Sequence, residues 1–392
     1  MKQRLDGLAV FRELLKDGAV AAFRELLQDC CRNDADNFVS HCGEFESLLF
    51  QQSDCWTAYL RRAVMESENV CIRNWASGAV TAVQEECLNR ELVFLDRLSQ
   101  VTLDDLTAGL DNAPDFLVGW RTEGGSIAQD YRQRMQEVGE KGYGIFARYH
   151  MFTVENGQLA PVKHPDPQQL EQLPGYEQER QKVIANTQAL LDGKPANNVL
   201  LYGDAGTGKS SAIKAIANNF AAQGLRLVEV KKNQLYQIPD LMDALAANPL
   251  KFILFIDDLS FTSNDDNFAA LKAILEGSVG GRAQNIAVYA TSNRRHLIKE
   301  TMTDRSGDDI HESDTRQELM SLSARFGLTV TFASPDRDRY LYIVGELAKQ
   351  YGVDLDEHTL AVRSEAFAIR MGGRSARVAK QFIELCKSGV QV

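Results

Sequence analysis

The chain has 392 residues, of which 44% are hydrophobic and 25% are charged, and its formal net charge is −11. A single hydrophobic core rarely grows past about 250–300 residues, so this length predicts two or three domains. The acidic balance argues against a broadly basic nucleic-acid surface. The longest apolar runs fall short of the roughly 18 residues that a membrane span needs.

Cysteine usage points to a reducing compartment. Six of the seven cysteines lie in the first 90 residues, and none forms a C-x-x-C pair. Zinc-site spacing is therefore missing. The N-terminal stretch MKQRLDGLAVFRELLKD carries charges too early for a secretory signal. We expect free thiols in a cytoplasmic protein without a membrane segment.

Residues 1–150 carry helical patterning. The segments Val10–Asp17 and Ala22–Asp29 are nearly identical, each with apolar residues at i, i+3 and i+4. Gly18 is expected to break the helix between them. Further along, Thr102 precedes two aspartates and predicts the N-cap of a short helix. The sequence thus predicts a mostly α-helical N-terminal domain over residues 1–150.

A hairpin and a proline-rich stretch come next. Asn156-Gly157 between two apolar stretches is typical of a two-residue type I′ turn. Prolines from Pro161 to Pro167 then indicate a stiff connector. We expect the hairpin and connector, residues 151–172, to separate two domains.

From residue 173 onward strands alternate with helices. Four short apolar runs, at residues 198–203, 225–230, 251–258 and 285–293, are separated by helix-like stretches. This alternation predicts a parallel sheet with crossover helices, and therefore an α/β domain over residues 173–333. Ser334-Pro335, as N-cap and first helical residue, is expected to open a helical lid, residues 334–392. Its helices are predicted at Asp336–Tyr351, Glu357–Met371 and Ser375–Lys387.

The segment GDAGTGKSS has the spacing of a phosphate-binding loop. It follows a predicted strand and opens a predicted helix, which is the context that G-x-x-x-x-G-K-[ST] requires. Glycines let successive backbone N–H groups converge on phosphate oxygens, and the helix N-terminus adds partial positive charge. Lys209 is the expected cation for the β- and γ-phosphates, and Ser210 the expected hydroxyl ligand of Mg²⁺. The candidate nucleotide-binding residues are Gly203, Asp204, Ala205, Gly206, Thr207, Gly208, Lys209, Ser210 and Ser211.

Two aspartates end the apolar run FILFIDD. Carboxylates at the end of a buried strand are costly unless a cation or a substrate meets them. Asp257 fits the Walker B role of holding hydrated Mg²⁺, and Asp258 the role of orienting or deprotonating water. Many P-loop ATPases have the longer Glu at the second position. Two solvated loop aspartates are the plainer alternative.

The next predicted strand ends in a polar residue, Asn293. It is the candidate for positioning the attacking water, with Thr291 and Ser292 as neighbours that could take this role. A helix N-cap is the alternative, and the two roles are compatible. The basic cluster Arg294–His296 is typical of a solvated face.

Together these motifs resemble the AAA+ ATPases, a branch of the P-loop NTPases. The resemblance rests on GDAGTGKS, ILFIDD, YATSN, SARF and GGRSAR, and it covers roughly residues 170–390. The paired aspartates and LSARFGLTVTFASPDRDRYLYIV look most like the replication-initiator and helicase-loader branch. The motifs are also similar to a family of bacterial AAA+ ATP-binding proteins whose biological role is uncharacterised.

The resemblance implies further site residues. In such ATPases an arginine at the position of Arg325 acts on the γ-phosphate bound by a neighbouring subunit, which implies a homo-oligomer. A cation at a helix end is the plainer interpretation. A lid arginine that senses nucleotide is implied at Arg377 or at Arg374. Gly175 and Tyr176 lie where related ATPases contact adenine.

The leading functional hypothesis is an ATP-hydrolysing oligomeric switch that remodels a protein partner held by the N-terminal domain. The alternative is an ATP-binding adaptor with slow or no turnover. A nucleic-acid-associated helper rests only on Lys231-Lys232 and Arg294-Arg295. The polar insert Lys299–Glu318 is expected to form a loop. The expected cofactors are ATP and Mg²⁺.

Overall fold

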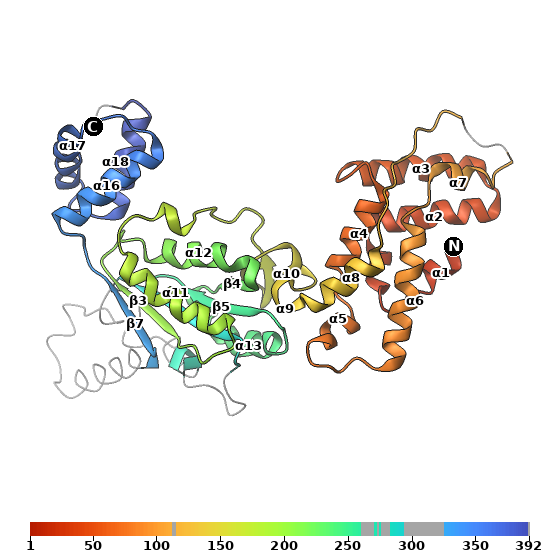
Figure 1. The fold of residues 1–392 in the computed structure, drawn as a ribbon, viewed down its shortest axis with the longest axis horizontal. Coiled ribbons are helices and arrows are strands. Elements are labelled where there is room, and N and C mark those ends of the chain that lie inside the picture. Colours follow the sequence, from red (N-terminus) through yellow and green to blue (C-terminus); the bar gives the residue numbers. More distant parts are fainter. Residues whose placement is uncertain (112–114, 260–269, 273, 276–282, 294–324, 391–392) are drawn as a thin grey trace. The chain divides into compact units, whose positions relative to one another are not determined.

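The computed structural model describes residues 1–111, 115–259, 270–272, 274–275, 283–293 and 325–390. They divide into two compact units, Met1–Arg148 and Tyr149–Val392. Figure 1 draws both units as ribbons. The basic cluster Arg294–His296 and the insert Lys299–Glu318 lie outside the described residues. Among the described residues, every helix is too short or too polar to span a bilayer.

The first unit is built from helices, as its patterning predicts. Their bounds are α1 Lys2–Asp6, η1 Arg12–Lys16, α2 Gly18–Arg32, α3 Ala35–Phe50, α4 Trp56–Glu66, α5 Val70–Trp75, α6 Ala82–Leu98, α7 Leu103–Thr107, α8 Ile127–Gln136, α9 Val138–Lys141 and α10 Ile145–Arg148. The predicted cap at Thr102 is confirmed, because its side chain accepts from the N–H of Asp105. Stacked and edge-on rings of Phe23, Phe45, Trp56 and Trp120 fill the core.

The near-repeat of this unit does not form two equal helices. The first copy gives only the 3₁₀ turn η1, and the second lies in α2. Gly18 is the first residue of α2 and not the break. The break falls at Asp17, whose extended backbone ends η1 and whose side chain accepts from the N–H of Val20.

The second unit is a mixed α/β structure. Its strands are β1 Met151–Glu155, β2 Gln158–Pro161, β3 Val199–Gly203, β4 Leu225–Glu229, β5 Lys251–Ile256, β6 Ile286–Ser292 and β7 Leu328–Phe332. In the described part of the chain they form one seven-stranded sheet in the order β2-β1-β4-β5-β6-β3-β7. Every neighbouring pair is parallel except β1 with β2. The central strand β5 is buried from Phe252 to Ile256, which is why its sequence is continuously apolar.

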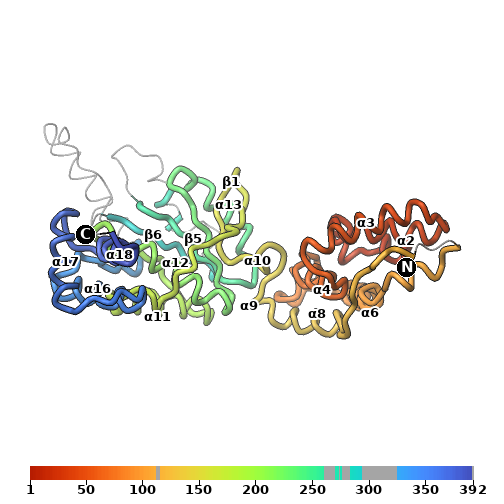
Figure 2. The backbone as a smooth tube through the Cα atoms, turned by 90° about the horizontal axis from the view of Figure 1, so that it is seen from above, coloured from red at the N-terminus to blue at the C-terminus, as the bar shows by residue number. Residues whose placement is uncertain are grey.

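Helices flank this sheet and form a cap at its end. The sheet helices are α11 Glu177–Leu191, α12 Lys209–Phe220 and α13 Ile238–Ala246, with 3₁₀ turns η2 Leu170–Gln172, η3 Ala221–Gln223 and η4 Lys232–Gln237. The lid helices are α16 Arg337–Tyr351, α17 Glu357–Arg370 and α18 Ala376–Lys387. Figure 2 shows the three lid helices gathered together.

The hairpin belongs to the sheet rather than to a connector. Asn156 and Gly157 both have positive φ, as the predicted turn requires. Strand β1 then pairs with β4, so residues 151–161 form one edge of the sheet. The boundary between the compact units lies at residues 148–149, before the hairpin. Local turn chemistry predicts the hairpin, but the pairing of β1 with β4 joins residues about 75 positions apart.

The lid begins with a different cap from the one predicted. Asp336, not Ser334, accepts from a backbone N–H of the first turn of α16, that of Arg339 at 2.8 Å. The helix therefore starts at Arg337, after Pro335. The backbone N–H of Ser334 instead donates to Asp204 at 2.7 Å.

The first unit contains a titratable ion pair. His41 Nδ1 lies 2.6 Å from Asp29 Oδ2, and the Asp29 side chain is only 5% exposed. The hydrogen bond to Asp29 raises the pKa of His41, against the opposing effect of burial. A raised folded-state pKa contributes stability that is complete below the unfolded value of about 6.5 and disappears as pH rises through the folded value.

We therefore expect His41→Gln to lower the free energy of unfolding more at pH 5.5 than at pH 8.5, by about 1 kcal/mol. Glutamine keeps a neutral donor for Asp29, so the difference reports the lost charge. Urea unfolding at both pH values measures it, with His164→Gln, at an exposed histidine, as the control. An equal loss at both pH values would show that the pair is not charged.

Candidate functional site

Three neighbouring strands bring their carboxyl ends together. In the sheet β6 lies between β5 and β3, and all three run parallel. Asp257 follows β5, Asn293 follows β6, and the glycine-rich loop follows β3. The chain leaves β3 through α12 and enters β4 on the far side of β5 and β6. Such a reversal of strand order opens a crevice at the carboxyl edge of a parallel sheet, where ligands bind.

Glycine is required in the loop for two different reasons. At Gly203, φ is +136°, and a Cβ would lie 2.0 Å from the backbone oxygen of Phe332 in the neighbouring strand. At Gly208, φ is +93° and the surrounding space is open, so only the backbone conformation demands glycine. The loop turns directly into α12, which begins at Lys209.

Lys209 is buried at the start of α12, with 6% of its surface exposed. Its ammonium donates to the backbone oxygens of Gly203 at 3.0 Å and Asp204 at 2.7 Å, and to Asn293 Oδ1 at 3.0 Å. An ammonium has three donors, so these acceptors use all of them. Burial lowers the pKa of Lys209, while Asp204, Asp258 and Asp257 act in the opposite direction. The side chain is a desolvated cation held by three neutral oxygen atoms, any of which an anionic oxygen could replace as the acceptor.

The two aspartates occupy different environments. Asp257 Oδ1 accepts from Ser210 Oγ at 2.6 Å and from Thr291 Oγ1 at 2.5 Å. Asp258 is exposed and receives Asn293 Nδ2 at 2.7 Å on Oδ1. Its φ is +51°, a conformation that non-glycine residues rarely adopt and that is over-represented at functional sites. Lys209, Asn293 and Asp258 therefore form one continuous polar chain.

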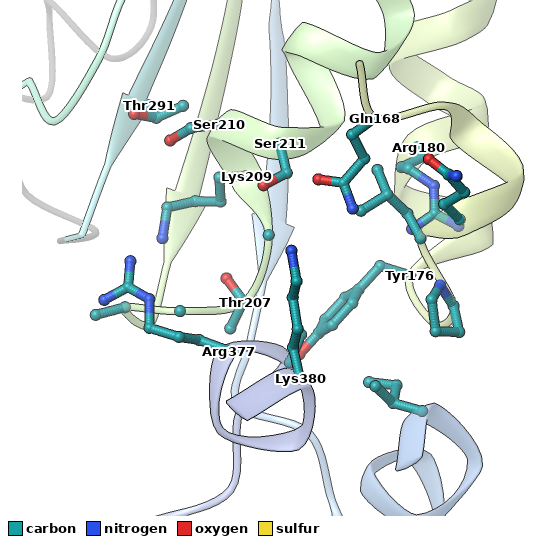
Figure 3. Close-up of a pocket in the computed structure, with 18 of the residues that line it drawn as sticks. Gln168, Tyr176, Arg180, Thr207, Lys209, Ser210, Ser211, Thr291, Arg377 and Lys380 are labelled. Carbon is teal, nitrogen blue, oxygen red and sulfur yellow. The ribbon is translucent and has the colours of Figure 1, made fainter. Parts of the chain in front are cut away.

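These groups line a cavity of about 580 Å³, a volume typical of small-molecule sites. Figure 3 shows Lys209, Thr207, Arg377 and Lys380 directed into it. The sequence-predicted residues on its wall are Tyr176, Ala205, Gly206, Thr207, Gly208, Lys209, Ser210, Ser211, Asp257, Asp258, Asn293 and Arg377. Gly203 and Asp204 support the loop from behind this wall.

The two lid arginines have different surroundings. Arg374 forms a bidentate ion pair with Glu365, with Nε–Oε1 and Nη2–Oε2 distances of 2.9 and 2.6 Å. This pair lies within the lid. Arg377 lines the cavity, and its backbone N–H donates to the oxygen of Gly206 at 3.0 Å. Of the two alternatives that the sequence leaves open, Arg377 is the one beside the loop.

Tyr176 lines the cavity, but almost none of its surface is exposed to a ligand. Its ring is 2% exposed, stacks on Phe332 at 5.2 Å and lies 4.9 Å beneath the Arg339 guanidinium. Its hydroxyl donates to the oxygen of Ala333 at 2.6 Å. Burial raises the pKa of this phenol to about 12, so it stays a donor. The tyrosine supports the cavity by packing.

Arg325 lies apart from this cavity. It precedes β7, and the cavity is at the carboxyl edge of the sheet, so a strand of five residues separates them. At a rise of about 3.3 Å per residue this is a separation of about 16 Å. The neighbouring Phe326 is buried, and Arg325 itself is half-buried.

Sequence patterns did not predict several wall residues. Lys380 lies one turn after Arg377 on α18, so the i, i+3 spacing could have indicated it. Arg180, buried in the first turns of α11, donates to the oxygen of Gly175. Gln168 belongs to the proline-rich segment, and its backbone oxygen accepts from Asn218 Nδ2 at 2.8 Å. No local signal brings such distant segments to one cavity.

Oxygen donors make up the acidic end of the cavity. Ser210, Asp257 and Asp258 offer a hydroxyl and carboxylates, which suit a hard cation such as Mg²⁺. In the described residues no group of three or more His, Cys, Asp or Glu side chains could hold a metal by itself. Mg²⁺ commonly binds through one or two protein oxygens together with substrate phosphates, so the residues fit an ion that arrives with its ligand.

Comparison with known proteins places the chain in a family. Residues 146–390 match the family described as Protein of unknown function (DUF815). The chain belongs to this family. The match spans the whole sheet and the lid, and therefore every residue of the cavity. No curated protein matches the chain.

Gly203→Ala tests the close approach of the loop to β7. We expect it to lower the free energy of unfolding by about 2–4 kcal/mol, because the new Cβ collides with the backbone oxygen of Phe332. Gly345→Ala is the matched control. Gly345 lies in α16 facing open space, where alanine should stabilise by about 0.5–1 kcal/mol. Urea unfolding measures both, and an unchanged Gly203→Ala would contradict this geometry.

Proposed function

We propose that the chain binds ATP together with Mg²⁺ and hydrolyses it, as a P-loop NTPase of the AAA+ type. The observation that carries the proposal is the cavity in which Lys209 and Ser210, at the start of α12, meet Asp257, Asp258 and Asn293. Phosphoryl transfer from a nucleotide uses such a set of groups. Here a cation and a hydroxyl lie at a helix N-terminus, and two carboxylates and an amide lie beside them.

The loop and the lid would hold the phosphates. Backbone N–H groups of the loop and the N-terminus of α12 provide fixed partial positive charge. Lys209 would exchange a backbone oxygen for a phosphate oxygen. Arg377 approaches the loop from α18 and would add a second cation. Ser210 and Asp257 would hold Mg²⁺, which neutralises charge on the β- and γ-phosphates.

Asp258 and Asn293 would act on the water. Water attacks the γ-phosphorus, the bond from that phosphorus to the β,γ-bridging oxygen breaks, and ADP and phosphate leave. The water proton passes to the Asp258 carboxylate, whose Oδ1 is held by Asn293 at 2.7 Å. Aspartate reaches less far than glutamate, and the left-handed backbone at Asp258 sets the direction of this shorter side chain.

Arg325 would complete the site of a second copy of the chain. Its place beyond the amino end of β7 puts it too far from the cavity of its own subunit to act there. A guanidinium stays charged and offers several donors to a phosphate. Because this contact joins two different surfaces, it predicts a ring or a helical homo-oligomer.

The N-terminal unit is proposed to bind a protein partner, which the ATPase would remodel. It is compact and has a core of its own, as expected of a binding module. A cytoplasmic location is supported by the seven cysteines, which are all free thiols. An adaptor that binds ATP without turnover remains the alternative, and the rate measurements below distinguish it. Nucleic-acid binding has no support among the described residues beyond the Lys231-Lys232 pair.

Lys209→Ala should weaken MgATP binding by at least about tenfold, because the buried cation that faces the phosphates is removed. Isothermal titration calorimetry with ATP and Mg²⁺ measures the affinity. Lys214→Ala is the control, since Lys214 lies on the same helix and faces Glu229 at 3.6 Å, outside the cavity. Failure of the wild-type chain to bind nucleotide would overturn the proposed function.

Arg325→Ala should leave ATP affinity unchanged and reduce turnover by about 10³-fold or more. The rate per subunit of the wild-type chain should rise with protein concentration, because each site needs a neighbour. Steady-state phosphate release over a range of concentrations tests both, with the exposed Arg90→Ala as control. A rate independent of concentration, and equal in the variant, would disprove the shared site. Tight binding without turnover would favour the adaptor.

A further inference from the structure

A short segment connects the sheet to the lid. Three of its backbone groups are hydrogen-bonded to Asp204 of the glycine-rich loop or to Tyr176 of the cavity wall. We call residues 332–334 the hinge; they comprise the last residue of β7 and the two that follow it. The oxygen of Phe332 accepts from the N–H of Asp204 at 3.1 Å. The oxygen of Ala333 accepts from the Tyr176 hydroxyl at 2.6 Å, and the N–H of Ser334 donates to Asp204 Oδ2 at 2.7 Å.

Asp204 is the residue common to the loop and the hinge. Its N–H and its carboxylate bind hinge residues on either side of Ala333, while its own backbone oxygen accepts from Lys209 Nζ at 2.7 Å. The hydrogen bonds from Ser334 lower the pKa of the Asp204 carboxyl. It is therefore an anion at neutral pH and makes a charge-assisted hydrogen bond to the hinge.

The loop is also bonded to the far end of the lid. The N–H of Arg377 donates to the oxygen of Gly206 at 3.0 Å. A Cβ at Gly206 would lie 3.0 Å from Ser375 Oγ and 3.1 Å from the Arg377 Cβ, so the loop and the start of α18 are in close contact. One short loop is thus attached both to the segment where the lid begins and to its last helix.

From these contacts we propose that Asp204 is a positioning residue that transmits phosphate occupancy of the cavity to the lid through Ser334. The inference rests on the proposed nucleotide site. All three donors of Lys209 are engaged by oxygen atoms, two of them the backbone oxygens of Gly203 and Asp204. A phosphate can bind this ammonium only if at least one of these hydrogen bonds breaks.

Breaking the bond from Lys209 to the Asp204 oxygen loosens the same residue that holds the hinge, because among the described residues this oxygen then keeps only the hydrogen bond from the Thr207 hydroxyl at 2.9 Å. Movement of the peptide that carries this oxygen changes the backbone torsion at Asp204, and a resulting shift of its Cα would redirect the N–H and the carboxylate that bind Phe332 and Ser334. Asp204 does not itself line the cavity. Its effect on the reaction would pass through the lid, which carries Arg377 into the site.

Asp204→Ala separates this role from phosphate binding. Hydrogen exchange of the peptide covering residues 330–338, followed by mass spectrometry with and without MgATP, measures the hinge directly. Without nucleotide we expect exchange of the Ser334 amide to be about tenfold faster in the variant, because a charge-assisted hydrogen bond is lost. With MgATP, exchange in the wild-type hinge should change, and the variant should show no further change.

Kinetics provide the second measurement. In Asp204→Ala the dissociation constant for ATP should stay within about threefold of wild type, while turnover falls about tenfold or more, because phosphate contacts remain and the lid no longer follows them. Asp204→Asn keeps an acceptor oxygen without the charge and should be intermediate. Asp243→Ala, at an exposed aspartate on α13, is the matched control and should behave as wild type.

The outcomes distinguish this inference from the proposed function. Absence of MgATP binding to the wild-type chain would overturn both. Binding by wild type with an equal nucleotide response of the hinge in Asp204→Ala would overturn only the role of Asp204. A parallel loss of ATP affinity and turnover in this variant would also overturn it, because Asp204 would then support the phosphates themselves.

Discussion

The position of β3 between β6 and β7 is the constraint on which the rest of the second unit depends. On one side β3 pairs with β6, so the glycine-rich loop lies beside Asn293 and near the aspartates that follow β5. On the other side β3 pairs with β7, so the same loop lies against the hinge of the lid. The pairing with β7 is close enough to exclude a side chain at Gly203. One strand therefore places the loop both beside the polar residues of the cavity and against the segment that leads into the lid.

Charge within the site is balanced by short polar contacts. A buried ammonium is costly unless it is hydrogen-bonded, and Lys209 meets this requirement with two backbone oxygens and one amide oxygen. Asn293 uses its other end to hold Asp258. The amide thus connects a cation that would bind phosphate with a carboxylate that would accept a proton. The two contacts share one amide group, so they depend on the same side-chain orientation of Asn293.

The lid is held by contacts of a different kind. Its three helices share a core with the sheet unit, to which Tyr340, Ile343 and Phe382 contribute. Within it, Arg374 is committed to Glu365, which leaves Arg377 at the cavity wall. On the side of α11, Tyr176 stacks on Phe332 and lies beneath the Arg339 guanidinium. The hinge is therefore held by the Asp204 carboxylate at Ser334 and by the Tyr176 hydroxyl at Ala333.

Local patterns were sufficient for most helices and strands of the second unit and for the residues that gather at its cavity. Each motif can be recognised from neighbouring residues alone: the spaced glycines with the lysine and serine that follow them, and the aspartates after an apolar strand. The structure brings these residues to one cavity. The hairpin turn, the cap at Thr102 and the lid helices were predicted for the same reason, because caps and turns depend on residues a few positions apart.

Contacts between segments that are distant in the sequence were determined only by the tertiary structure. The sequence predicted the hairpin of β1 and β2 as part of a segment between two domains, and pairing with β4 made it part of the sheet. Ser334 is a residue type that favours a helix cap. In the structure its N–H instead donates to the carboxylate of Asp204, 130 residues earlier. The sequence left Arg374 and Arg377 as alternatives, and the structure pairs Arg374 with Glu365 and places Arg377 at the cavity wall. Sequence periodicity reports which residues share a strand or a helix face, whereas these outcomes depend on which strands become neighbours.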